Sequence, residues 1–241
     1  MKILALETAA KAVSAAITED GKVLAAGYQD TGLTHSATLM PIVEGLFRNT
    51  GLAPVDVDVV AVSAGPGSFT GVRIGVSAAK GIAFAVEKPA AAVSTLAALA
   101  RNVAFADGLI ICAMDARRQQ VYNALFEAKN GILTRLTPDR AISLEDLAAE
   151  LRNDPRPRRI VGDGARLCMD FMTEAGILCR LAPPHLVMQN AVSVALEAEV
   201  LAAEGKLVTA QELAPVYLRP PQAERLRMER KLETDKNTKG S

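Results

Sequence analysis

Tryptophan is absent from this chain of 241 residues, and aromatic residues make up only 4% of it. Half of the residues are hydrophobic nonetheless, so alanine and valine must form most of the core, as in α/β proteins with closely packed helices. A net charge is also missing, because 27 basic residues balance 27 acidic ones. A protein that binds nucleic acid by itself needs a basic surface, so this balance argues against that function for the chain alone.

Cysteine and histidine are scarce as well. Cys112, Cys168 and Cys179 show no CxxC spacing, and we expect them to be reduced core thiols of a cytoplasmic protein. His35 is followed four residues later by Leu39, so this segment lacks the pair of histidines that a zinc site on one helical face needs. No secretory signal is recognisable, and no apolar run is long enough to cross a bilayer. A metal centre and membrane insertion are therefore not expected.

The most informative run is GPGSFTGVRIG, residues 65–75, with four glycines and one proline. A buried strand is expected before it over 57–62, and a helix after it over 72–86, with Thr70 as the predicted N-cap. Such a turn either binds a phosphate with its backbone N–H groups or lets helix and strand backbones approach closely. The run matches neither the Walker pattern nor a dinucleotide fingerprint, so the glycine content favours close packing.

The chain repeats one pattern at an offset of 108 residues. An apolar strand expected over 3–7 ends in Glu7, and another over 109–115 ends in Asp115. Each is followed by strands joined at a DG or NG pair, the usual signature of a tight hairpin turn. This recurrence indicates an internal duplication into two similar lobes.

The two repeated acids are candidates for a cleft between the lobes. Glu7 and Asp115 would both point into such a cleft, which is how the actin-like ATPase and sugar-kinase superfamily holds magnesium and nucleotide phosphates. For Glu7, a carboxylate that accepts backbone N–H bonds in a turn is an equally good interpretation. The candidate residues of a nucleotide or phosphate cleft are Glu7, Gly67, Ser68, Arg73, Asp115, Gly162 and Gly164.

Two expected helices, over 35–49 and 72–86, carry more apolar surface than one core contact requires. The apolar side chains of the first spread over about 160° at 100° per residue. The second has only two charged residues and is rich in small ones. Its second apolar side lies either deep in the core or in a subunit interface, and both alternatives stay open. The predicted partner-interface residues are Leu39, Met40, Val43, Phe47, Ile74, Val76 and Lys80.

Six segments together resemble the TsaB (YeaZ) family. They are ILALETAAKAVSAAI, HSATLMPIV, GPGSFTGVRIG, DARRQQVY, VGDGA and PVYLR, and the resemblance extends over residues 1 to about 221. The resemblance implies an α/β protein with the two-lobed actin-like ATPase and sugar-kinase (ASKHA) fold and duplicated ribonuclease H-like lobes. The expected N-terminal lobe is 1–106 and the C-terminal lobe 107–221, with a helix near 190–205 that packs back on the first lobe. A mobile charged tail is expected over 222–241.

The resemblance also implies a function. TsaB-like proteins are non-catalytic subunits of the machinery that forms N6-threonylcarbamoyladenosine at position 37 of tRNAs decoding ANN codons. Such a subunit binds and stabilises the catalytic subunit TsaD through the two apolar helices, works with TsaE, and forms a homodimer when alone. We therefore expect no metal or cofactor, with ATP or ADP and Mg²⁺ present only in the assembled complex. Contact with tRNA is expected to be indirect, in the cytoplasm and away from membranes.

Two other functions compete with this one. The chain could act alone as an ATP-dependent phosphotransferase or ATPase of the actin-like superfamily, but its phosphate motifs are poor. A metallopeptidase activity, attached by analogy to the TsaD paralogue, needs an HxxxH motif, and Leu39 replaces its second histidine. The first strand of the family usually ends in Asp-Thr-Ser, whereas this chain has Glu7-Thr8-Ala9, which further weakens a magnesium–nucleotide role.

Overall fold

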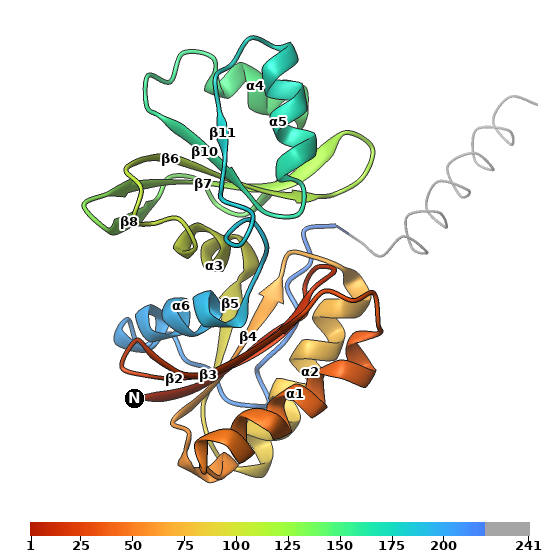
Figure 1. Ribbon diagram of the computed structural model, residues 1–241, viewed down its shortest axis with the longest axis vertical. Coiled ribbons are helices and arrows are strands. Elements are labelled where there is room, and N and C mark those ends of the chain that lie inside the picture. The colour runs from red at the N-terminus through yellow and green to blue at the C-terminus, as the bar shows by residue number, and fades with distance from the viewer. Residues whose placement is uncertain (220–241) are drawn as a thin grey trace, which may run out of the picture.

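Each lobe is built on one mixed β-sheet, and Figure 1 shows the two sheets with helices outside and between them. The computed structural model describes residues 1–219. The tail predicted over 222–241 lies outside the described residues.

The first sheet has the strand order β3-β2-β1-β4-β5. Its first three strands form an antiparallel meander, whereas β4 and β5 continue the sheet parallel to β1. Strands β1 and β4 are apolar along nearly their whole length because helices cover both faces of the sheet. The bounds are β1 Lys2–Glu7, β2 Val13–Glu19, β3 Lys22–Gln29, β4 Val59–Gly65 and β5 Ala90–Ser94.

The second sheet repeats this order. It runs β8-β7-β6-β10-β11, again an antiparallel meander followed by two parallel strands, with β9 added beside β7. Both meanders turn at a pair with positive φ, Asp20-Gly21 and Asn130-Gly131. The predicted duplication and the actin-like, two-lobed α/β fold are thereby confirmed. The bounds are β6 Gly108–Asp115, β7 Gln120–Lys129, β8 Ile132–Arg135, β9 Arg140–Ser143, β10 Arg158–Val161 and β11 Arg180–Leu181.

The helices form outer and inner layers. Helices α1 and α2 cover the outer face of the first sheet, α4 and α5 the outer face of the second, and α3 and α6 lie between the sheets (Figure 1). The bounds are α1 His35–Thr50, α2 Phe69–Ala85, α3 Thr95–Arg101, α4 Leu144–Leu151, α5 Ala165–Glu174 and α6 Ala191–Ala203.

Helix α2 begins earlier than the sequence predicted. Its N-cap is Ser68, whose Oγ accepts a hydrogen bond from Gly71 N at 3.3 Å. The backbone N–H of Ser68 also donates to Ala9 O in the β1–β2 turn at 2.7 Å, which fixes the start of the helix against the sheet. Thr70 therefore lies inside the first turn, and its prediction as the N-cap is wrong.

The end of the described chain returns to the first lobe. Helix α6 packs on β1, β2, β4 and β5, where Val194 is fully buried. Val208 then pairs with Ala90 at the edge strand β5. The helix predicted near 190–205 thus packs on the first lobe, as expected, and Val208 extends that contact beyond the helix.

Apolar side chains fill the spaces between these layers, and the three cysteines belong to this core. Cys112, Cys168 and Cys179 are buried and unpaired, as expected of core thiols. Among residues 1–219, no helix is both long enough and apolar enough to span a membrane.

Candidate functional site

A cleft of about 420 Å³ opens between the two lobes. Its first-lobe wall comes from the β1–β2 turn and the start of α2, and its second-lobe wall from the end of β6, Tyr122 on β7 and Asp163 after β10. Residues 216–219 line the same cleft. Three of the residues predicted for it line it: Gly67, Ser68 and Asp115.

The carboxylate of Glu7 lies behind the cleft, in the core. Its side chain is 0% exposed and accepts hydrogen bonds from Ala9 N and from Ser63 Oγ. Burial raises the pKa of Glu7 to about 7, although the bonds from Ser63 and Ala9 favour its charged form. This corrects the prediction that Glu7 points into the cleft. The geometry is that of the alternative, a carboxylate that accepts a backbone N–H in a turn.

Two carboxylates do line the cleft, Asp115 and Asp163. Asp115 Oδ1 accepts a hydrogen bond from Arg117 N at 2.7 Å, which shapes the loop after β6. Asp163 Oδ1 accepts one from Gln189 Nε2 at 3.4 Å. Burial raises the pKa of Asp163, and the negative charge of Asp115 acts in the same direction.

The glycine-rich run before and inside α2 permits close packing. A β-carbon at Gly67 would lie 2.4 Å from Ala9 O, and one at Gly71 would lie 2.1 Å from Thr8 O. At Gly75 it would lie 2.3 Å from Thr8 Oγ1. The β1–β2 turn already fills the space that side chains at these positions would need, so α2 can lie directly against it. The packing interpretation of the run accounts for this geometry.

The second predicted phosphate turn, Gly162-Asp163-Gly164, is packed in the same way. Gly162 N donates to Val187 O at 2.7 Å, and Gly164 N donates to Ala113 O at 3.0 Å. Their N–H groups therefore already have acceptors within the protein. Neither glycine lines the cleft, although Asp163 between them does.

These contacts do not fit a magnesium–nucleotide site in the chain's own cleft. One of the two predicted carboxylates is buried, and the second glycine turn has its N–H groups satisfied. No group of three His, Cys, Asp or Glu within residues 1–219 is placed to hold a metal ion. The lone helix histidine, His35, has its Nε2 atom 2.7 Å from Ala10 O, a hydrogen bond within the protein.

Sequence reasoning missed several residues that the cleft uses. Lys11, Tyr122 and Arg219 line it, and none had been singled out as a site residue. The DARRQQVY and PVYLR segments contain Tyr122 and Arg219, so the family-like motifs carried the signal. Their spacing alone did not reveal that the two segments meet.

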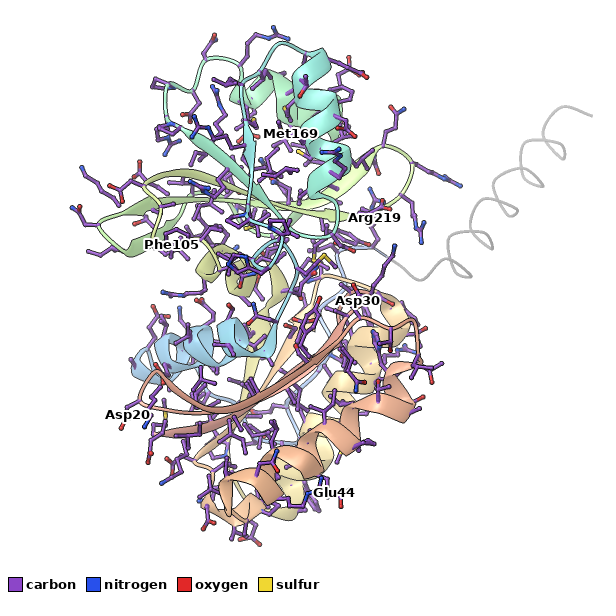
Figure 2. All side chains as sticks on the ribbon, viewed as in Figure 1. Asp20, Asp30, Glu44, Phe105, Met169 and Arg219 are labelled. Atoms are coloured by element: carbon purple, nitrogen blue, oxygen red, sulfur yellow. The ribbon has the colours of Figure 1, made fainter. Side chains whose placement is uncertain are left out.

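A second candidate site is the outer surface of α1 and α2. A groove of about 500 Å³ lies between these helices. Met40 is 46% exposed there and Phe84, at the far end of α2, is 64% exposed. Figure 2 shows Glu44 on the outer side of α1, where no other helix or strand of residues 1–219 covers the pair. The C-terminal segment contacts α2 at Phe69, Arg73 and Lys80. We call this surface the docking face and define it by Met40, Phe69, Ile74, Ala78 and Phe84. Exposed apolar surface of this kind marks protein–protein contacts.

Burial divides the residues predicted for a partner interface. Leu39, Val43 and Val76 are 1%, 3% and 4% exposed and belong to the core of the first lobe. This corrects their assignment, because side chains on the inner side of a helix have no surface left for a partner. Four predicted positions keep exposed surface: Met40, Phe47, Ile74 and Lys80.

Two predicted cationic residues have partners inside the chain. Lys80 Nζ donates to Gln211 O at 2.8 Å and to Leu213 O at 3.4 Å, so it holds the returning C-terminal segment. Arg73 was predicted at the phosphate cleft but lies at the docking face. Its Nε atom donates to Tyr217 Oη at 2.8 Å.

Known proteins are similar to this chain in sequence and in fold. Residues 29–225 match the family model described as TsaD, tRNA N6-adenosine threonylcarbamoyltransferase. The tRNA threonylcarbamoyladenosine biosynthesis protein TsaB of Bacillus subtilis is 39% identical over 167 residues, which are 69% of this chain and 73% of that protein. TsaB of Escherichia coli is 32% identical over 222 residues, 91% of this chain and 95% of its own.

A solved structure agrees with these relatives. YeaZ from Pseudomonas aeruginosa superposes with a TM-score of 0.78 at 29% identity, over 90% of this chain and 99% of that one. Fold, motifs and sequence similarity thus converge, and the chain belongs to the TsaB (YeaZ) family.

Proposed function

We propose that this protein is the non-catalytic scaffolding subunit of the complex that forms N6-threonylcarbamoyladenosine at position 37 of tRNAs decoding ANN codons. Its membership of a family named for this biosynthesis supports the proposal. In this proposal, the docking face binds the catalytic subunit TsaD, and TsaE completes the complex. The complex acts in the cytoplasm, and the chain contacts tRNA only indirectly. Without TsaD, the same face pairs with a second copy of the chain.

The observation that carries the proposal is the uncovered docking face. Its exposed apolar residues come from two adjacent helices. Ala78 and Gly81 have small side chains or none, so another helix can approach the backbone of α2 closely at these positions. A β-carbon at Gly81 would meet nothing within 4 Å, so this position is open toward solvent. A low apolar helix pair accepts a second helix pair by packing ridges into grooves.

The cleft supports a role without catalysis. Glu7 is buried and the GDG turn has no free N–H at Gly162 or Gly164, so the chain offers little to a nucleotide. We therefore place any ATP or ADP and Mg²⁺ only in the assembled complex.

Reconstitution tests the function. Purified chain, TsaD, TsaE, threonylcarbamoyl-adenylate and unmodified tRNA are combined, and modified tRNA is quantified with and without this chain. We expect modification to collapse when the chain is omitted, and the chain alone to leave ATP and tRNA unchanged. Magnesium-dependent ATP turnover by the isolated chain would favour the phosphotransferase alternative instead.

A pair of variants tests the docking face. Met40→Glu places a charge at an exposed apolar position of α1, and we expect binding to TsaD to weaken about tenfold or more. Leu178→Glu is the control, because Leu178 is 82% exposed on the second lobe, away from the docking face. Equal binding by the two variants in a titration would place the interface elsewhere.

A further inference from the structure

The segment Val216–Arg219 crosses from the first lobe to the second beside the cleft. Figure 2 shows Arg219 at the junction of the lobes. The segment lines the cleft together with residues of both lobes. We call it the strap.

The first anchor of the strap is on β4. Val216 N donates to Ala64 O at 2.7 Å. A β-carbon at Gly65 would lie 2.2 Å from Val216 O, so the glycine leaves room for the strap to pass directly over the strand end. Gly65 also has a φ of +127°, a conformation that residues with side chains rarely adopt.

The second anchor is on the first turn of α2. The rings of Tyr217 and Phe69 are 4.8 Å apart, and the guanidinium of Arg73 lies 4.0 Å from the centre of the Phe69 ring. Arg73 Nε donates to Tyr217 Oη at 2.8 Å, which closes the three side chains into one cluster. Phe69 and Arg73 also line the groove of the docking face. Tyr217 therefore contacts the residues that shape one end of that face.

The third anchor is on the second lobe. Arg219 Nη1 donates to Ala116 O at 2.9 Å, and its Nη2 donates to Gln120 Oε1. The guanidinium also lies 5.7 Å from the centre of the Tyr122 ring. Residues 117–119 between these partners all have positive φ, so this loop is held in a conformation that side chains disfavour. Arg219 contacts both ends of the loop.

We propose that the strap couples closure of the inter-lobe cleft to the docking face, with Tyr217 and Arg219 as its positioning residues. The inference rests on the proposed function, because it assigns the docking face to TsaD. Separation of the lobes would displace Arg219. Because only one residue lies between Arg219 and Tyr217, that displacement would reach the cluster of Tyr217, Phe69 and Arg73. A partner seated on α1 and α2 would then favour one degree of cleft closure.

Full-length Arg219→Ala and Tyr217→Ala test the coupling. Arg166→Ala and Tyr28→Ala are the controls, since each removes an exposed side chain of the same kind from another surface. The titration with TsaD should show both strap variants weakened about tenfold and both controls unchanged. Tyr217→Phe keeps the ring stack and should recover most of the binding. The melting temperatures should stay close to that of the parent, which separates positioning from loss of fold.

Hydrogen exchange of the chain alone provides the second readout. We expect Tyr217→Ala to accelerate exchange in the loop 116–120, and Arg219→Ala to accelerate exchange in the first turn of α2. If the strap couples its anchors, loss of one anchor must loosen the backbone at the other. Binding that falls only in Tyr217→Ala would overturn the coupling, since Tyr217 would then be an ordinary contact. If the parent does not bind TsaD, the proposed docking function fails, and the exchange experiment alone decides the coupling: acceleration only at the mutated anchor overturns it.

Discussion

The two lobes share a strand order but present different outer surfaces. On the first lobe, α1 and α2 expose apolar and small side chains. On the second, the outer side of α5 carries an ion pair between Arg166 and Asp170, and α4 exposes Glu145 and Glu150. Charged helix faces remain solvated, whereas apolar ones are covered by partners. The two lobes therefore share a topology but differ in the chemistry of their outer helices.

The two lobes also differ at the ends of their equivalent first strands, β1 and β6. Glu7 ends β1 and is buried under the start of the β1–β2 turn, where Ser63 on β4 binds it. Asp115 ends β6, and its side chain is 37% exposed because the following loop bends away through residues 117–119. One topological position thus holds a core carboxylate in one lobe and a cleft carboxylate in the other.

The largest expected effect is on the free energy of unfolding, and it distinguishes the buried side of α2 from the exposed side. Val76→Glu would bury an unpaired charge in the first-lobe core and should lower the free energy of unfolding by more than about 4 kcal/mol. Phe84→Glu, on the exposed side, should leave it within about 0.5 kcal/mol. Urea denaturation followed by circular dichroism measures both. Similar stability of the two variants would contradict the assignment of inner and outer sides.

The next effect compares the two strand-end acids. The pKa of Glu7 is raised from 4.5 to about 7 by burial, so the folded state retains a proton that the unfolded state releases first. The free energy of unfolding should therefore fall as the pH rises from about 4.5 to about 7, by about 3 kcal/mol at 1.36 kcal/mol per pH unit. Glu7→Gln should remove most of this slope and be the more stable protein at pH 8.

The control for this prediction is Asp115→Asn. Its side chain lies at the cleft and can still accept the bond from Arg117 N, so the pH slope should persist in this variant. Burial also raises the pKa of Asp163, and a small residual slope is expected in Glu7→Gln. A slope of unchanged size in Glu7→Gln would show that the buried acid does not titrate in this range.

The smallest expected effects concern two glycines of α2. Gly71→Ala would force a β-carbon against Thr8 O and should cost about 2 kcal/mol of stability. Gly81→Ala faces open space in the same helix and should stabilise the protein by up to about 1 kcal/mol, because alanine favours the helix. Opposite signs in thermal unfolding would support close packing as the reason for the glycine-rich run, and a neutral Gly71→Ala would contradict it.

Local sequence signals predicted most of the elements. The strand and hairpin patterns predicted both meanders. Ser143 caps α4 by accepting a hydrogen bond from Asp146 N at 3.0 Å, a local interaction typical of a helix start. The alanine-rich stretch 90–94 was missed as a strand, because parallel pairing with β4 overrides the helix preference of alanine.

Long-range contacts explain most of what the sequence could not show. Helical periodicity identifies α1 and α2 as apolar but does not show which apolar side faces the sheet. It therefore predicts Val43 and Val76 as interface residues, although both are buried. Arg219 meets Ala116 across 103 positions of the chain, and no local pattern encodes that meeting. The burial of Glu7 likewise depends on Ser63, which comes from a different strand.

The position of α6 has a consequence for synthesis on the ribosome. The inner face of the first sheet, with Ile3 and Ala61, is covered by a helix that begins only at residue 191. Residues 1–106 therefore emerge with an apolar sheet face that stays uncovered until residues 191–203 have also been synthesised, an aggregation-prone interval. A purified 1–106 fragment should accordingly bind a hydrophobic dye, and cooperative unfolding without dye binding would show that this lobe folds before its cover arrives.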